Sequence, residues 1–488
     1  MTKESTVELT GFSRSLNIYI NDDLIGTLIE DNDIWALAYD EKWAHMEGSF
    51  DLSPALPRSQ LFHRDGATMR PVQWYFDNLL PEEKLREQIA LDASLRDKDD
   101  AFALLEYLGV ESAGAMILLP PGQSPERHAA LKPLTYSELS RRISNLPTTT
   151  LTKEAPKRMS LAGAQHKLLV VLKGDDFYEP VSGTPSTHIL KPDHPDKQTY
   201  PASTYLEWLT MRLAMAARME VPSVRLLTVP EPVYVIERFD RRFAPKELAS
   251  QSGSEPADVE RLHIIDACQL LNKSRVYKYA GASVQTLREI ALACSDELAL
   301  PTRLFRWLVF NLLVANDDCH LKNLSFLVSP SRFELSPHYD LLATGVYHTR
   351  AFADERATWP AVPLAVRLSE QVTRFDQVTP ASIIKAASEL GLPASVAKRI
   401  TGEVIQRTMR EFDVIFASHY PEEPTLVEPK GRPGPKVSKQ PALFDEAVAI
   451  KDDEKTSDCV SPEVLAQQLK ILRVLRFVVL PEMAKRLV

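Results

Sequence analysis

Cysteine is scarce in this chain of 488 residues, and long apolar runs are absent. No two of the four cysteines form a C-x-x-C pair, so their spacing fits neither a disulfide framework nor a cysteine zinc site. No uninterrupted apolar segment reaches the length of a membrane helix, and the first residues lack the apolar stretch of a secretion signal. We therefore predict a cytoplasmic protein in a reducing compartment, with no membrane partner.

Glycine is also infrequent, with 17 residues against 35 prolines, which indicates many stiff turns. The formal net charge of −9 argues against a broad surface that coats nucleic acid, although it leaves room for a local basic patch. DNA contact would need a partner or a tail. A chain of this length exceeds what one hydrophobic core usually organises, so we expect two or three structural units.

The first unit, residues 1–125, is predicted to be a small sheet with helices. Apolar and polar residues alternate from Leu16 to Leu28 around a polar turn, which indicates two short strands, and Trp35–Tyr39 indicates a third. Helical patterns then run to about Tyr107. The apolar segment Gly114–Pro120 predicts a buried strand, and the Pro-Gly pair after it marks a boundary near residue 125.

The second unit, residues 126–424, mixes strand and helix patterns and becomes largely helical, so we predict an α+β fold. Helices are predicted at Tyr205–Met219 and Arg303–Val314. Strands are predicted at Leu168–Lys173, His188–Pro192, Val233–Glu237, Leu324–Val328 and Phe333–Leu335.

The last part of the chain changes composition. Proline, lysine and acidic residues dominate from Pro421 to Lys455, so residues 425–460 are predicted to be a linker. Ser461 then caps a helix from Val464 to about Leu480, within a C-terminal segment 461–488 of unknown role. An apolar stripe along this helix could either dock on the chain itself or bind a partner.

The polar residues after the apolar helix Arg303–Val314 have the composition of a phosphoryl-transfer site. Such a site needs a base for the acceptor hydroxyl, oxygen ligands for metal ions and a cation for the phosphates. Asp318 lies five residues before Asn323, which could place a carboxylate at the acceptor and an amide oxygen on a metal. Asp340, beyond the predicted hairpin, could be the charged metal ligand.

Lys191 ends a predicted strand and could reach phosphate oxygens, while Glu207 of the following helix could hold it by an ion pair. The sequence lacks the Gly-x-Gly-x-x-Gly loop, the His-Arg-Asp sequence and the Asp-Phe-Gly sequence of ordinary protein kinases. An ordinary protein kinase is therefore excluded.

The residues do resemble another family. Asn316–Asn323 is similar to the Asp-x-His-x-Lys-Asn catalytic loop of the HipA family, the kinase toxins of bacterial toxin–antitoxin pairs. The likeness runs from about residue 14 to about residue 415, and it implies the HipA-like two-subdomain kinase fold. It also implies a serine/threonine protein kinase that uses ATP and Mg²⁺, in which Asp318 is catalytic and Asn323 and Asp340 bind the metal.

Three further segments carry the resemblance. Ser160–Lys167 resembles the family's Ser-x-Ala-Gly-Ala-Gln-x-Lys segment, whose backbone amides can cradle phosphate. Thr187–Lys191 resembles the nucleotide-lysine strand, and Glu237–Arg241 resembles the hinge that meets adenine. Ser160 would be an autophosphorylation site that shuts the enzyme off. The implied nucleotide-binding residues are Ala162, Gly163, Ala164, Gln165, Lys167, Lys191, Glu237, Phe239, His320 and Lys322.

Some positions have a simpler interpretation. A histidine after a helix, such as His320, is more often an orienting hydrogen-bond partner than a proton carrier. Ser160 taken alone could be a turn cap. The chain departs from the family at Ile264 and Ile265, where members usually carry polar residues, so contacts to substrate there are in question.

Resemblance also implies partners. A separately encoded, HipB-like helix-turn-helix antitoxin would hold the kinase inactive and would carry most of the contact with operator DNA, and the protein substrate could be an aminoacyl-tRNA synthetase. Two alternatives stay open: a corepressor that keeps the fold without the activity, and a small-molecule phosphotransferase with a similar set of acids.

Overall fold

The computed structural model describes residues 14–126, 129–156, 162–163, 165–243, 259–294, 299–420 and 460–488. Ser160, Ala164 and residues 425–459 of the predicted linker lie outside this part of the chain. Within the described residues, no helix is both long enough and apolar enough to cross a bilayer.

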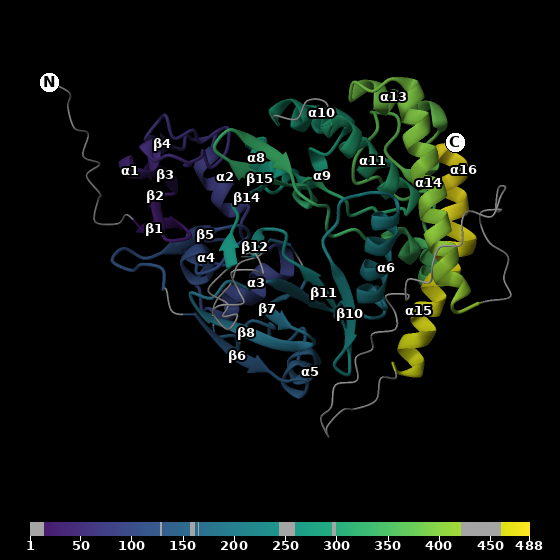
Figure 1. Cartoon of the computed structure of the whole chain (residues 1–488), viewed down its shortest axis with the longest axis horizontal. Helices are drawn as coiled ribbons and strands as arrows, with labels where there is room; N and C mark the ends of the chain where they lie inside the picture. Colours follow the sequence, from purple (N-terminus) through teal and green to yellow (C-terminus); the bar gives the residue numbers. More distant parts are fainter. Residues whose placement is uncertain are drawn as a thin grey trace.

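The N-terminal unit is built on a five-stranded antiparallel sheet in the order β4-β3-β2-β1-β5 (Figure 1). Its alternating residues bury one face, on which Leu16 and Ile18 are fully enclosed. Strands were predicted at four of these places. The strands are β1 Arg14–Ile20, β2 Asp23–Asp31, β3 Ile34–Tyr39, β4 Phe62–Arg64 and β5 Met116–Leu119. The helices of this unit are α1 Glu41–His45, α2 Pro71–Asp77, α3 Glu83–Asp92 and α4 Ala101–Leu108.

A second antiparallel sheet has six strands in the order β10-β11-β9-β7-β8-β6. The apolar run of β7 was predicted with the same bounds and β8 was not predicted as a separate strand, whereas β6 and β10 were missed altogether. Both missed strands are edge strands, and β6 contains Pro133, which an edge strand tolerates because one side needs no ladder donor. The strands are β6 Ala129–Leu134, β7 Leu168–Lys173, β8 Asp176–Ser182, β9 His188–Pro192, β10 Val224–Thr228 and β11 Pro232–Glu237. The helices beside this sheet in sequence are α5 Tyr136–Ser144 and α6 Ser203–Ala216.

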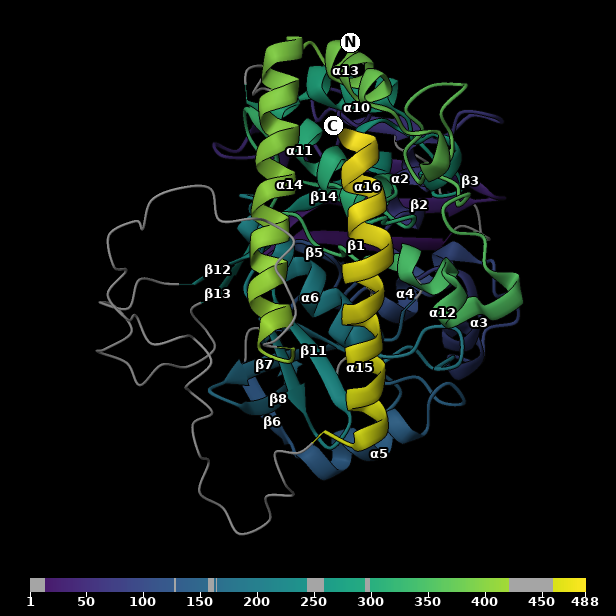
Figure 2. The same cartoon turned by 90° about the vertical axis from the view of Figure 1, so that its right-hand side faces the viewer.

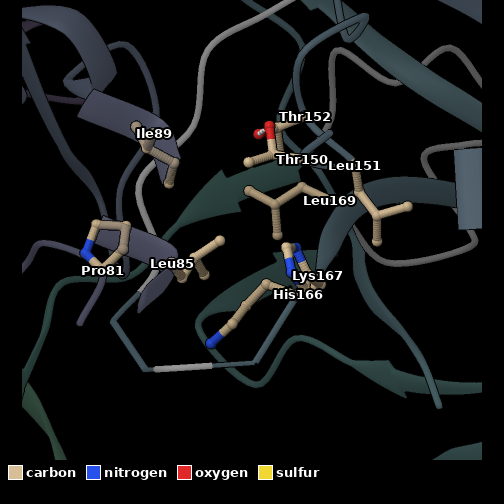
Figure 3. Close-up of a pocket in the computed structure, with 9 residues that line it drawn as sticks. All are labelled: Pro81, Leu85, Ile89, Thr150, Leu151, Thr152, His166, Lys167 and Leu169. Carbon is tan, nitrogen blue, oxygen red and sulfur yellow. Dashed lines mark hydrogen bonds between the residues drawn. The ribbon is translucent and has the colours of Figure 1, made fainter. Parts of the chain in front are cut away.

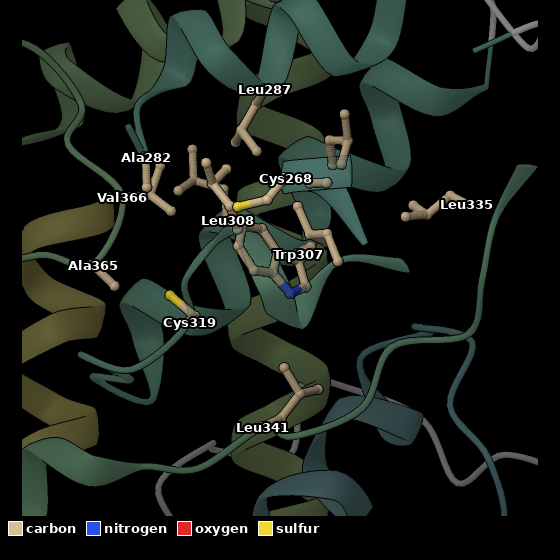
Figure 4. Close-up of a cluster of buried hydrophobic side chains, with 14 of the residues drawn as sticks. Cys268, Ala282, Leu287, Trp307, Leu308, Cys319, Leu335, Leu341, Ala365 and Val366 are labelled. Carbon is tan, nitrogen blue, oxygen red and sulfur yellow. The ribbon is translucent and has the colours of Figure 1, made fainter. Parts of the chain in front are cut away.

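The rest of the described chain is mostly helical and surrounds α11, Leu300–Leu313. This helix contributes Trp307 to a buried core that also contains Cys268, Leu308 and Cys319 (Figure 4). The other elements are β12 Arg241–Phe243, β13 Val259–Arg261, β14 Ile264–Asp266, α8 Ala267–Leu270, α9 Tyr277–Ala280, α10 Val284–Ala293, β15 Ser325–Ser329, β16 Arg332–Leu335, α12 Arg350–Ala353, α13 Pro380–Glu389 and α14 Ala394–Ala417. The 3-10 turns are η2 Leu321–Asn323, η3 Thr344–His348, η4 Asp354–Arg356 and η5 Phe375–Gln377.

The C-terminal helix is longer than predicted. It comprises α15 Pro462–Val474, a π-helical turn η6 Leu475–Val479 and α16 Leu480–Leu487, so the end expected near Leu480 is wrong. Pro481 stands in the first turn of α16, where the missing N–H costs little after the widened π turn. Figure 2 shows this helix alongside α14, and the fully buried Leu472 and Leu475 place its apolar stripe against the body of the chain. The stripe therefore docks on the chain itself.

Candidate active site

Lys191, at the end of β9, lies between two carboxylates. Its Nζ is 2.7 Å from Glu207 Oε1 of α6 and 2.6 Å from Asp340 Oδ1, so the predicted Lys191–Glu207 ion pair is confirmed. Burial alone would lower the pKa of Lys191, but the two carboxylates outweigh it and hold the pKa above its ordinary value. The lysine is therefore a fixed cation that joins β9, α6 and the segment after β16.

The two carboxylates beside Lys191 differ in protonation. Burial would raise the pKa of Asp340, but the Lys191 ammonium lowers it to about 2, so Asp340 stays ionised. Burial raises the pKa of Glu207 to about 7 despite the same ammonium. Asp340 also has a left-handed backbone, with φ +57°. An L-residue in that region is strained and is often found where the fold fixes a side chain for function.

The loop after α11 folds back on itself through hydrogen bonds between its own residues. Asn316 Oδ1 accepts from the Asp318 backbone N–H at 3.0 Å, and the Asp318 carbonyl accepts from Asn323 Nδ2 at 2.9 Å. Asn316 is in turn held by Asn311 of α11, at 2.8 Å between Nδ2 and Oδ1. Because the Asn323 amide nitrogen is occupied, its amide oxygen is the atom that could meet a cation.

Asp318 is half-buried within this loop, and burial raises the pKa of its carboxyl to about 7. A hydrogen bond from the Tyr279 hydroxyl to Oδ1 acts in the opposite direction, and the nearby Asp340 and Asp317 carboxylates add to the rise. Asp318 and Asp340 therefore share one electrostatic environment. A carboxylate that titrates near neutral pH has the basicity that general-base catalysis requires.

His320 is buried beneath the ring of Tyr279, with the ring centroids 4.9 Å apart in an edge-on contact. Burial and the Lys278 ammonium lower the pKa of His320 to about 4, so the imidazole is neutral at neutral pH. A neutral, enclosed imidazole fits an orienting role better than a role in proton transfer.

Lys322 points away from the predicted nucleotide site. Its Nζ donates to Asn78 O at 2.7 Å, to Asn78 Oδ1 at 2.9 Å and to Asp266 Oδ2 at 2.8 Å, and Glu82 Oε1 lies 3.5 Å away. These protein oxygens take all three ammonium protons, so none is left for a phosphate. The prediction that Lys322 binds nucleotide is not supported; it ties the loop to the N-terminal unit instead.

Gly163 and Lys167 are the predicted phosphate-loop residues for which the structure shows specific contacts. Gly163 has φ +113°, its carbonyl accepts from the Glu82 N–H at 3.2 Å, and a Cβ on it would stand 2.8 Å from Lys167 Nζ. Lys167 Nζ donates to the Ala162 carbonyl at 2.5 Å, and burial together with Lys191 lowers the pKa of Lys167 to about 8. The positive φ thus favours glycine here, and a Cβ at this position would displace the end of the Lys167 side chain. Gln165, another residue of the predicted nucleotide site, is half-buried.

A small, partly open pocket lies beside this loop (Figure 3). Its walls come from α3 and Pro81 on one side, and from the segment Thr150–Thr152 and the start of β7 with the two residues before it on the other. The lining residues are Pro81, Leu85, Ile89, Thr150, Leu151, Thr152, His166, Lys167 and Leu169. The pocket shares Lys167 with the site but contains neither Lys191 nor Asp318, so it adjoins the candidate active site without forming it.

The predicted hinge begins at Glu237, the last residue of β11. The amide N–H of Glu237 is taken by the Ser223 carbonyl at 2.9 Å, which leaves the Glu237 carbonyl oxygen as the atom that could meet an adenine amine. The Phe239 ring stacks on Tyr339, with centroids 5.4 Å apart, and Tyr339 Oη is 3.0 Å from the Lys322 carbonyl. The hinge therefore contacts the segment that bears Asp340 and, through it, the Asp318 loop.

Asn323 and Asp340 are chemically suited to Mg²⁺. They offer an amide oxygen and an ionised carboxylate, both hard ligands. Within the described residues, no group of three or more His, Cys, Asp or Glu side chains gathers as a complete metal site. A cation bound here would need its remaining ligands from phosphate and water, which is the usual situation for Mg²⁺ in nucleotide sites.

Several residues at the site were not predicted from sequence. Tyr279 bonds Asp318, while Asn78 and Asp266 hold Lys322, and none of the three was assigned a role at the site from the sequence. A buried ion network also joins the N-terminal unit to the hinge: Arg238 and Arg241 contact Glu111 at 3.5 and 3.1 Å. Ile264 and Ile265 are both buried in β14, so they form core rather than a substrate contact.

Comparison with known proteins identifies relatives over most of the chain. Residues 16–119 match the HipA N-terminal domain, and residues 159–412 match the HipA-like C-terminal domain. The serine/threonine-protein kinase toxin HipA of Shewanella oneidensis is 32% identical over 359 residues, which are 69% of this chain and 77% of the relative. A putative kinase of Sinorhizobium fredii, Y4mE, is 35% identical over 350 residues, covering 68% and 78% respectively.

A solved structure is also similar. It is the Shewanella oneidensis toxin–antitoxin complex of HipA, HipB and operator DNA, which matches with a TM-score of 0.67 and 28% sequence identity. The match covers 85% of this chain and 92% of that chain. The predicted two-subdomain α+β fold is confirmed by this likeness.

Proposed function

Starting from the fact that the chain belongs to the HipA family, we propose that it is a serine/threonine protein kinase toxin. It would transfer the γ-phosphoryl group of ATP to a serine or threonine hydroxyl of a protein. The observation that carries the proposal is the joint placement of Lys191, Glu207 and Asp340 in ion-pair contact, with Asp318 in electrostatic reach. A corepressor without activity would have no need of this arrangement.

The proposed reaction uses Asp318 as the group that orients the acceptor. The acceptor oxygen forms a bond to the γ-phosphorus, the bond from that phosphorus to the β–γ bridging oxygen breaks, and ADP leaves. The proton of the acceptor hydroxyl passes to the Asp318 carboxylate, whose pKa of about 7 matches neutral operating conditions. Lys191 offers its ammonium to phosphate oxygens, while Glu207 keeps that ammonium in place.

Mg²⁺, when bound with ATP, would neutralise charge that develops on the phosphates, and Asn323 and Asp340 are the residues that would hold it. Gly163 and Lys167 would cover the phosphates, with Ala162 and Gln165 beside them, while the backbones of Glu237 and Phe239 would meet adenine. His320 would act as an orienting neighbour of Asp318, in keeping with its burial and neutrality.

Control by a partner is a second part of the proposal. The similar Shewanella oneidensis chain forms a complex with HipB and operator DNA, and this chain is proposed to bind a comparable, separately encoded helix-turn-helix antitoxin. Copurification of the chain with the product of a neighbouring small gene tests this part, and a DNA mobility shift that needs both proteins would support it.

The resemblance further supports Ser160 as an autophosphorylation site and an aminoacyl-tRNA synthetase as the substrate. Mass spectrometry of the chain after incubation with ATP and Mg²⁺ tests Ser160 directly, with Ser160→Ala as the matched control. Label transfer to purified synthetases, one at a time, tests the substrate, and transfer to none of them would remove that class.

The kinase assignment itself is tested by incubating the purified chain with γ-labelled ATP and Mg²⁺ and following label on protein. We expect transfer by the wild type and a loss of about 10²-fold to 10⁴-fold in Asp318→Asn, the range that general-base catalysis contributes. Equal transfer by the two chains would refute the role of Asp318. Label that appears only on added small alcohols or aminoglycosides would indicate a small-molecule phosphotransferase instead.

A further inference from the structure

The Tyr279 hydroxyl contacts the same carboxylate that an acceptor hydroxyl would have to reach. The residue belongs to α9, a short helix 39 residues before Asp318 in the sequence, and its phenol O–H donates to Asp318 Oδ1. Within the described residues, no other side chain is hydrogen-bonded to this carboxylate, whereas the Asp318 backbone is fully engaged within the loop. The interaction is chemically the same as the one a serine or threonine acceptor would make.

We propose that Tyr279 is an acceptor-site gate: its hydroxyl occupies the position on Asp318 that the acceptor hydroxyl takes, and substrate must displace it. This inference rests on the proposed kinase function. It adds a residue that would govern access of the protein substrate rather than binding of the nucleotide. Tyr279 is therefore a positioning residue and not a catalytic one.

The surroundings of Tyr279 allow the ring to move while the helix stays in place. The residue is 42% exposed, so its side chain can swing into solvent without opening the core. The helix is fixed by its neighbour Lys278, whose Nζ is 2.5 Å from Glu82 Oε2 and 3.3 Å from Glu83 Oε1. The backbone of Glu82 also bonds Gly163, so the gate is anchored on the residue that borders the phosphate loop.

The predicted energetic effect follows from competition. A hydrogen bond to a charged group contributes roughly ten-fold to a hundred-fold in an equilibrium constant. The apparent affinity for the acceptor is reduced by the fraction of molecules in which Asp318 is covered. Removing the phenol hydroxyl should therefore lower KM for the acceptor protein by about ten-fold, with little change in KM for ATP.

Tyr279→Phe is the test, because it removes the hydroxyl and keeps the ring against His320. The measured quantity is label transfer from γ-labelled ATP with Mg²⁺ to an intact, tagged Asp318→Asn chain, whose own transfer is expected to be at least about 10²-fold slower. The assay is run at about pH 8.5, because burial raises the pKa of Asp318 and loss of the phenol hydrogen bond raises it further. Tyr277→Phe is the matched control: Tyr277 lies on the same helix, is 51% exposed and makes no side-chain contact with Asp318.

If Tyr279 is a gate, Tyr279→Phe has a lower KM for the acceptor protein and Tyr277→Phe has unchanged kinetics. The KM for ATP is unchanged in both variants. Asp318-dependent transfer that Tyr279→Phe leaves unchanged or reduces would overturn the gate while leaving the kinase assignment intact. Absence of Asp318-dependent transfer in every chain would instead overturn the proposed function. A thermal melting temperature equal to that of the wild type shows that Tyr279→Phe is folded. Phosphate found on Tyr279 itself would also contradict the role of Tyr279 as a gate.

Discussion

Replacing Lys322 by methionine separates a structural role from a nucleotide-binding role for this residue. The lysine side chain is 3% exposed and joins Asp266 at 2.8 Å and Asn78 at 2.7 Å, across the boundary between the catalytic loop and the N-terminal unit. Burial would lower its pKa, but Asp266 and Glu82 outweigh that effect and hold the pKa above its ordinary value. The lysine is therefore charged, and the buried carboxylates beside it depend on that charge for compensation.

Methionine keeps the length of the side chain and removes the charge, so it leaves the Asp266 carboxylate buried without a counter-ion. Loss of one member of a buried ion pair typically costs about 3–5 kcal/mol in the free energy of unfolding. We expect the lower end, about 3 kcal/mol, because Glu82 keeps Lys278 as a partner. A second substitution, Asp266→Asn, should recover part of the loss in a double-mutant cycle.

The assay is urea unfolding followed by tryptophan fluorescence, with binding of a fluorescent ATP analogue measured in parallel. Lys98→Met is the matched control, because its pair with Glu87 is exposed on both sides and should not affect stability measurably. The structural account predicts a large loss of stability and retained nucleotide affinity in the molecules that remain folded. Wild-type stability together with lost nucleotide affinity would refute it and restore Lys322 to the nucleotide site.

Three further predictions follow from named contacts. Glu207→Gln leaves the Lys191 ammonium with Asp340 alone, so the rate of label transfer should fall about ten-fold to a hundred-fold, and an unchanged rate would deny Glu207 a positioning role. Gly163→Ala should lower the melting temperature by several degrees and weaken binding of ATP, since the new Cβ meets Lys167 Nζ and the φ of +113° suits only glycine. Burial lowers the pKa of His263 to about 3. The unfolded histidine has a pKa of about 6.5, so the unfolded state takes up a proton and stability is lost as pH falls below about 6.5. The loss reaches about 2 kcal/mol at about pH 5. His263→Gln should remove that part of the acid sensitivity in urea titrations, and an unchanged pH dependence would count against it.

Local features of this chain could be predicted from its sequence. The apolar run of β7 ends at a polar Gly-Asp-Asp turn, so its bounds follow from hydrophobicity and turn chemistry alone. The Lys191–Glu207 pair was also within reach, because a strand end and the following helix are close in sequence and the two charges are complementary. Edge strand β6 was missed because Pro133 is a breaker in a central strand and harmless at an edge.

Long-range contacts explain the remaining differences. Lys322 meets Asn78 across 244 positions of sequence, and Tyr279 meets Asp318 across 39. No periodicity or short motif encodes such pairs, because they depend on how separate units pack. The motif that contains Lys322 groups it with the loop residues, whereas packing turns its side chain toward the N-terminal unit. The sequence motifs indicated which segments form the candidate site. Tertiary contacts determine which side chains of those segments point into it.

The most direct test of the kinase assignment compares nucleotide binding with phosphoryl transfer in two variants. Asp318→Asn should bind the fluorescent ATP analogue with Mg²⁺ as the wild type does, yet transfer label at least about 10²-fold more slowly, because the carboxylate is needed for the acceptor alone. Lys191→Met should lose nucleotide affinity as well as transfer, because the ammonium is proposed to contact the phosphates. Wild-type rates of label transfer in Asp318→Asn, or undiminished nucleotide affinity in Lys191→Met, would contradict the account.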